Sequence, residues 1–106
     1  MLHKTFPIVG VGASAGGLNA FSRLLKSLPI DTGMAFVLVQ HLDPKHVSLL
    51  PDLLGRTTMM RVVEVTDGVI VEANSVYVMP PNHSLVILHG VLHLLPRLDI
   101  DRKSVV

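Results

Sequence analysis

The hydrophobic positions along this chain follow two different periods. Between residues 18 and 28, leucine and phenylalanine recur at spacings of three and four, which predicts an amphipathic helix over residues 15–28 that ends at Pro29. A second helix is predicted over residues 48–57, with Pro51 near its first turn. Short runs rich in valine, isoleucine and leucine predict strands at residues 8–11, 34–40, 61–65, 69–71, 76–79, 85–88 and 91–95.

The order of these elements predicts an α/β fold. A strand, a helix and a strand of this length form a right-handed crossover, so residues 8–11 and 34–40 should be parallel neighbours whose carboxyl ends share an edge. The last two strands meet through His89 and Gly90, which predicts an antiparallel hairpin near the carboxyl end. We therefore expect a doubly wound, mostly parallel, Rossmann-like sheet in one domain over residues 1–106.

Composition narrows the possible partners. Of the 106 residues, 49% are hydrophobic and 16% are charged, yet the apolar runs are far shorter than the roughly 18 residues of a membrane span. The net charge of +1 and the absence of a lysine and arginine cluster argue against nucleic acid. There is no cysteine, and residues 1–6 are too short and polar for a secretory signal. We expect a cytoplasmic protein without membrane insertion.

A cluster of small residues follows the first strand and predicts a tight turn into the helix, because glycine permits sharp reversals and the close approach of a ligand. A phosphate-binding P-loop would need a lysine after Gly17, where the chain has Leu18, so that interpretation fails. A dinucleotide fingerprint is matched by Gly10, Gly12 and Ala15. Its ribose-binding acid is missing, because the second strand ends in glutamine and histidine.

The same turn also matches the nucleophile elbow, Gly-x-Ser-x-Gly, through Gly12, Ser14 and Gly16. Neighbouring strands lie about 4.8 Å apart, so Ser14 after the first strand and His41 after the second should come within hydrogen-bonding range. A serine beside a base is the minimum for acyl transfer. Taken singly, Ser14 could simply cap the helix, and His41 could be a solvated turn residue. Because both residues are expected at the carboxyl ends of neighbouring strands, the catalytic interpretation is favoured.

Three further histidines lie near the predicted hairpin. No carboxylate or cysteine accompanies His83, His89 and His93 at a familiar metal-ligand spacing. We interpret them as exposed hairpin residues and expect no metal site.

Four stretches, in order along the chain, resemble the catalytic domain of the CheB-type protein-glutamate methylesterases of bacterial chemotaxis. They are residues 8–18, 36–44, 67–68 and 76–82. The resemblance implies hydrolysis of glutamyl methyl esters, and deamidation of glutamines, on the cytoplasmic helices of chemoreceptors. It implies that Ser14 is the nucleophile and His41 the general base. The backbone N–H groups of Ala15 and Gly16 would hold the oxyanion, and no cofactor is implied.

The chain also departs from the family pattern. Many members have threonine at the position of Ala15. Alanine at this position resembles the subgroup fused to receptor methyltransferases, so a fused or partner methyltransferase is expected. The triad acid of the family lies in a glycine-rich loop, which neither Asp99 nor Asp101 matches. We therefore expect the amino-terminal part of a longer catalytic domain, truncated here and nearly inactive alone. Its first strand would be an exposed apolar edge, which predicts a dimer or swapped assembly. The alternatives are a non-catalytic interaction domain and a nucleotide-binding α/β module.

Overall fold

The computed structural model describes residues 6–13, 17–40, 50–80 and 83–96. Within these ranges the elements are β1 (Ile8–Ala13), α1 (Gly17–Lys26), β2 (Ala35–Gln40), α2 (Leu50–Gly55), β3 (Arg61–Glu64), β4 (Val69–Ile70), β5 (Ser75–Val78), β6 (His83–Leu88) and β7 (Val91–Pro96). Every strand and both helices predicted from the hydrophobic pattern are present, with ends that differ by a few residues. The first two residues predicted for each helix lie outside the described residues.

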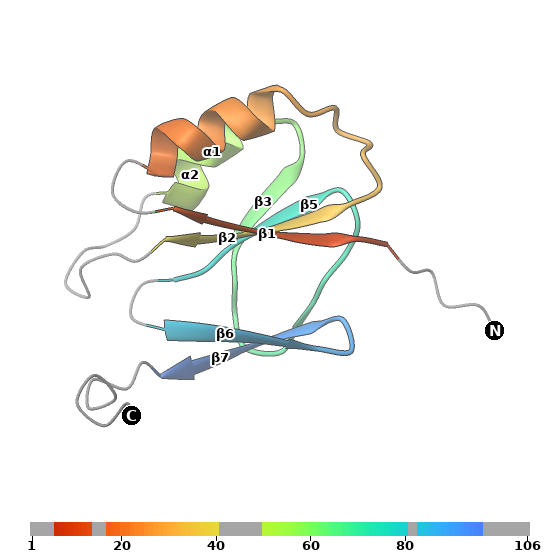
Figure 1. Ribbon diagram of the computed structural model, residues 1–106, viewed down its shortest axis with the longest axis vertical. Coiled ribbons are helices and arrows are strands. Elements are labelled where there is room, and N and C mark those ends of the chain that lie inside the picture. The colour runs from red at the N-terminus through yellow and green to blue at the C-terminus, as the bar shows by residue number, and fades with distance from the viewer. Residues whose placement is uncertain (1–5, 14–16, 41–49, 81–82, 97–106) are drawn as a thin grey trace.

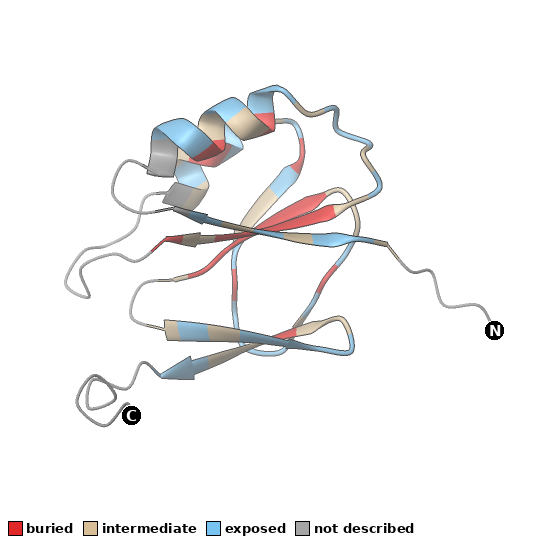
Figure 2. Cartoon of the chain, viewed as in Figure 1, coloured by how far each residue is buried: buried red, intermediate tan, exposed pale blue. Residues whose placement is uncertain are grey.

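Four strands form a parallel sheet, called sheet A, in the order β1-β2-β5-β3 (Figure 1). β1 and β2 are neighbours, in a register that runs from Ile8 opposite Ala35 to Ala13 opposite Gln40. This pairing confirms the predicted crossover, in which α1 joins two adjacent parallel strands. β2 and β5 are the central strands and are almost entirely buried (Figure 2). Among the described strands, β1 lies at one edge of sheet A, as predicted.

Both described helices lie against the same face of sheet A (Figure 1). Phe21 and Leu25 of α1, each 1% exposed, belong to one buried cluster with Phe36 and Leu38 of β2 and Leu54 of α2. Burying one such side chain contributes about 1.5–3 kcal/mol, so this packing stabilises a ten-residue helix that would be marginal in isolation. No helix in the described part of the chain is long and apolar enough to cross a bilayer.

A small antiparallel sheet, called sheet B, covers the other face of sheet A in the order β4-β7-β6 (Figure 1). Tyr77 and Val37 of sheet A pack with Leu92 of β7 and with Val71 in a second buried cluster. The predicted fold class is therefore confirmed as a mostly parallel sheet with an antiparallel hairpin. In the described part, the second face of the parallel sheet is covered by strands and not by helices.

The predicted hairpin of β6 and β7 has a two-residue turn. His89 and Gly90 both have positive φ, at 51° and 76°, which is the signature of a type I′ turn. Glycine adopts this conformation without strain, whereas the histidine is an uncommon occupant. The hairpin pairs from His83 opposite Pro96 to Leu88 opposite Val91.

The turn predicted at Asp67 and Gly68 lies between the two sheets. β3 belongs to sheet A and β4 to sheet B, so the chain crosses here from one layer to the other. Gly68 has a φ of 88°, and its N–H donates to the carbonyl of Leu92 at 2.8 Å. The Oδ1 atom of Asp67 accepts a hydrogen bond from the N–H of Leu94 at 2.9 Å. These bonds fasten the crossing to β7.

Candidate active site

The candidate site lies at the carboxyl ends of β1 and β2. Ala13 and Gln40 are the last residues of these two strands and stand opposite each other in the parallel ladder. Neighbouring strands are about 4.8 Å apart, so the chain leaves both strands at adjacent points of one sheet edge. In open parallel sheets this edge is where ligands bind.

The predicted site residues Ser14, Ala15, Gly16 and His41 lie outside the described residues. The structure describes the elements that flank them. The chain passes from the end of β1 to the start of α1 through residues 14–16, and His41 directly follows the last residue of β2. The roles predicted for these four residues stay predictions.

α1 begins at Gly17, three residues after the predicted nucleophile Ser14. The helix carries a partial positive charge at this end, which favours an anion. Its first turn contains no acidic residue, and its last turn carries Arg23 and Lys26. No negative side chain in the first turn of α1 therefore weakens the attraction of this helix end for an anion. This end of the sheet suits a developing oxyanion.

An apolar groove lies between the two sheets along β1. It has a volume of about 250 Å³ and is lined by Ile8 and Gly10 of β1, Val37 and Val39 of β2, Leu85 and Ile87 of β6, and Leu92 of β7. A Cβ atom built at Gly10 would meet no atom within 4 Å, and one at Gly12 would lie 3.9 Å from the carbonyl oxygen of Val39. The described residues thus impose no steric need for glycine at either position. These glycines lie within β1, which extends two residues beyond the predicted strand.

The hairpin histidines do not form a metal site in the described part of the chain, where no group of three or more potential ligands gathers. The Nδ1 atom of His93 lies 3.7 Å from the Oδ1 atom of Asp67. The same carboxylate oxygen accepts the N–H of Leu94, so it bonds the turn before β4 to β7.

Comparison with known proteins decides the family. The family model for CheB methylesterase matches residues 9–105. The chain belongs to the CheB methylesterase family. Among solved structures, the catalytic domain of the CheB methylesterase of Thermotoga maritima superimposes with a TM-score of 0.73 and 27% sequence identity, over 89% of this chain. The family resemblance and the fold predicted from the sequence are confirmed.

Curated relatives include proteins described as protein-glutamate methylesterase/protein-glutamine glutaminase. The protein of Methanosarcina barkeri is 33% identical over 81 residues, which cover 76% of this chain and 22% of that protein. One from Anaeromyxobacter dehalogenans is 36% identical over 80 residues, covering 76% of this chain and 23% of its own length. The chain also covers 51% of the solved Thermotoga maritima CheB domain. It therefore spans about a quarter of these relatives and about half of that domain.

Proposed function

We propose that this chain contributes the serine and histidine of a site that hydrolyses glutamyl methyl esters on chemoreceptors. The membership in the CheB methylesterase family supports the reaction class. The register that sets Ala13 opposite Gln40 is the observation that carries the assignment of residues, because Ser14 and His41 are the next residues of the two strands. The same chemistry on a glutamine amide would release ammonia, and the relatives are described with both activities.

The proposed reaction is acyl transfer in two steps. The Oγ atom of Ser14 attacks the ester carbonyl carbon while His41 accepts the hydroxyl proton. The tetrahedral oxyanion is held by the N–H groups of Ala15 and Gly16, which precede α1 in the sequence, each worth about 3–4 kcal/mol in comparable sites. His41 returns the proton to the methoxy oxygen and methanol leaves. Water, deprotonated by His41, then cleaves the acyl-serine and releases the glutamate side chain.

We further propose that the 106-residue chain alone turns over slowly. In a serine hydrolase triad, an acid holds the histidine in the correct tautomer, and losing that function costs about 10⁴ in turnover. Neither Asp99 nor Asp101 matches the family motif for that acid. The proposed substrate partner is the cytoplasmic helical region of a chemoreceptor, with a fused or separate methyltransferase as a second partner.

The test is covalent labelling, which needs the serine and histidine but not full turnover. The 106-residue chain is incubated with a serine-reactive phosphonate and analysed by mass spectrometry of intact protein and peptides. We expect one adduct, on Ser14, that is lost in Ser14→Ala and falls at least about a hundredfold in rate in His41→Ala. Ser84→Ala and His93→Gln, both on sheet B, are the matched controls and should label at the rate of the unaltered chain.

Methanol release from a methylated receptor peptide is measured in parallel. A rate close to that of a complete CheB domain would contradict the proposed slow turnover. Labelling spread over several serines, or unchanged in His41→Ala, would overturn the proposed site and favour a non-catalytic interaction domain. A thermal shift with NAD or FMN in place of labelling would favour a nucleotide-binding module.

A further inference from the structure

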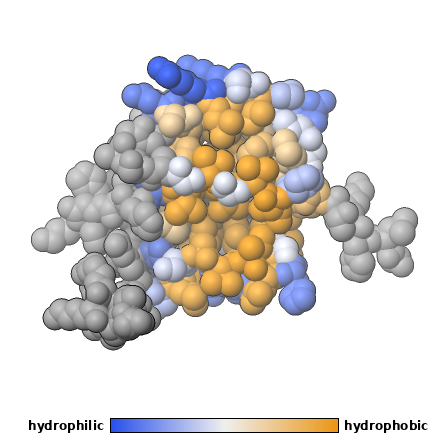
Figure 3. Space-filling view, viewed as in Figure 1, coloured by the Kyte–Doolittle hydropathy of each residue, from blue (hydrophilic) through white to orange (hydrophobic). Residues whose placement is uncertain are grey.

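Gln40 interrupts the apolar pattern of sheet A at the edge that carries the candidate site. It is the last residue of β2 and is only 8% exposed. Figure 3 shows mostly hydrophobic residues across the middle of this side of the molecule. Apart from Tyr77, the buried residues in the described part of the chain include two with polar side chains, Gln40 and Ser75. A buried amide is costly unless its hydrogen bonds are made, so the glutamine needs partners.

The amide of Gln40 is directed to the face of sheet A that carries the helices. Side chains alternate along a strand, and Phe36 and Leu38 pack in the cluster under the helices, whereas Val37 packs toward sheet B. Gln40 follows Leu38 by two residues and is still part of the ladder, opposite Ala13 of β1. Its side chain therefore lies on the helix side, just beyond the aliphatic cluster.

The beginning of α1 lies over this position. α1 runs back across sheet A from its carboxyl edge, beside the arrowheads of β1 and β2 (Figure 1), and Phe21 belongs to the same buried cluster as Leu38. Gly17 precedes Phe21 by four residues, which is about 6 Å along the helix axis. Gln40 lies about 7 Å beyond Leu38 along β2. Because the two offsets match, the buried amide lies close to the point where the chain enters α1.

The main chain at this point has groups that a glutamine amide can bond. The first four N–H groups of a helix have no acceptor within the helix, and the carbonyl groups of the preceding turn also need partners. A glutamine amide offers two N–H donors and one carbonyl acceptor, so it can bond both kinds of group. In the part of the chain that the structure describes, no buried side-chain nitrogen or oxygen lacks a hydrogen-bond partner, which agrees with a bonded amide.

We propose that Gln40 is a positioning residue, whose amide bonds the main chain between β1 and α1 and thereby fixes the turn that carries Ser14. This role rests on the proposed function, in which Ser14 is the nucleophile. A displacement of about 1 Å in a reacting group can cost about a hundredfold in rate, so the turn needs firm support. Gln40 does not touch the substrate, and acts by holding the nucleophile and the oxyanion donors from the core side.

The first test removes the amide and keeps the volume. Gln40→Met has a side chain of similar length without the amide, and circular dichroism shows whether it is folded. Ser75→Ala is the matched control, because Ser75 is also buried but begins β5, at the opposite edge of the parallel sheet. Amide hydrogen exchange at residues 15–18 should become at least about tenfold faster in Gln40→Met and stay unchanged in Ser75→Ala.

The second test uses the serine-reactive phosphonate at a series of concentrations. A displaced nucleophile lowers the maximal rate of labelling and leaves the binding of the reagent unchanged. In Gln40→Met we expect the maximal rate to fall at least about tenfold, while the half-saturating concentration changes by less than about twofold. A merely structural role gives a different result, because partial unfolding lowers the amount of protein that is labelled and not the rate of the folded fraction.

Gln40→Glu is a second variant, which keeps the length of the side chain and its acceptor but replaces the donor with a negative charge. Close to the oxyanion, this charge opposes the transition state. Labelling of Ser14 should therefore be slower in Gln40→Glu than in Gln40→Met.

Unchanged exchange at residues 15–18 in Gln40→Met, or equal acceleration in Ser75→Ala, would overturn the positioning role. A maximal labelling rate close to that of the unaltered chain in either folded Gln40 variant would also overturn it. If the unaltered chain shows no labelling of Ser14, the proposed function fails, and the exchange result alone decides whether Gln40 holds the turn.

Discussion

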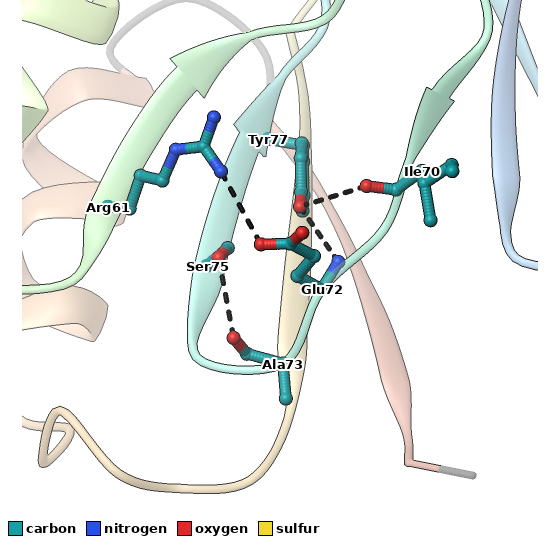
Figure 4. Close-up of polar contacts among 6 residues, drawn as sticks. All are labelled: Arg61, Ile70, Glu72, Ala73, Ser75 and Tyr77. Atoms are coloured by element: carbon teal, nitrogen blue, oxygen red, sulfur yellow. Dashed lines mark hydrogen bonds and ion pairs between the residues drawn. The ribbon is translucent and has the colours of Figure 1, made fainter. Parts of the chain in front are cut away.

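The hydroxyl of Tyr77 is a polar link between the two sheets, and its removal gives a sharp test of how they are held together. Tyr77 lies in β5 at the centre of sheet A and is 1% exposed. Its Oη atom accepts the N–H of Glu72 at 2.8 Å and donates to the carbonyl of Ile70, at the end of β4, at 3.4 Å (Figure 4). Sheet A is thereby bonded to the segment that leaves sheet B.

We expect Tyr77→Phe to lower the free energy of unfolding by about 1–2 kcal/mol. A neutral hydrogen bond contributes about 0.5–1.5 kcal/mol net, and a partner left partly buried adds to the loss. The bond from Glu72 is short and supplies most of this value, whereas the 3.4 Å bond to Ile70 supplies little. The aromatic ring keeps its packing, so no cavity term applies. For a domain of about 100 residues the change corresponds to a drop in Tm of roughly 4–15 °C.

The measurement is urea unfolding followed by circular dichroism, with hydrogen exchange at the Glu72 amide as a local readout. Ser75→Ala is the matched control, because Ser75 is also a buried hydroxyl of β5 but donates only a 3.4 Å bond to the carbonyl of Ala73 (Figure 4). We expect it to cost less than about 0.5 kcal/mol. Equal losses in the two variants, or unchanged exchange at Glu72 in Tyr77→Phe, would refute the assignment of the inter-sheet link to the tyrosine hydroxyl.

Two further predictions concern the helix and the hairpin. Leu25→Ala should lower the free energy of unfolding by about 3 kcal/mol in the same urea assay, because the side chain is 1% exposed in the core under α1. The control is Leu24→Ala, which should cost clearly less because Leu24 is only half-buried. Equal losses in the two variants would contradict the packing described. Gly90→Ala should lower the free energy of unfolding by about 1–2 kcal/mol, because Gly90 has a φ of 76°. The control is Gly55→Ala, which should change it by less than about 0.5 kcal/mol, because Gly55 has open space around it and no positive φ. An unchanged stability in Gly90→Ala would contradict the type I′ turn.

The strands, the helices and the parallel pairing of the first two strands were predictable because each rests on a local signal. β2 and β5 are almost continuous hydrophobic runs, as expected for strands buried on both faces. α1 shows the three and four spacing of a helix that packs on one side. The hairpin turn was marked by Gly90. These signals need only neighbouring residues.

The layer to which β4 belongs was not predictable in this way. Val65 and Val69 lie on either side of the same turn, and the residue types at these two positions do not indicate that the chain passes from one sheet to the other between them. That change depends on contacts with β7, which is distant in sequence, such as the bond from Gly68 to Leu92. The groove is equally non-local, because it needs β1 and β6 to lie on one side of the molecule. The catalytic roles of Ser14 and His41 stay predictions.

The placement of the candidate site follows from the core and not from the site residues themselves. In β2, Phe36 and Leu38 pack under the helices, while Ala35 and Val37 pack against sheet B. Sliding the strand by one residue would exchange these faces and put Phe36 where the space suits alanine, so the register of β2 is fixed by its burial. The same register sets Ala13 opposite Gln40. A core substitution that shifted β2 would therefore separate the proposed nucleophile from its base without changing either residue.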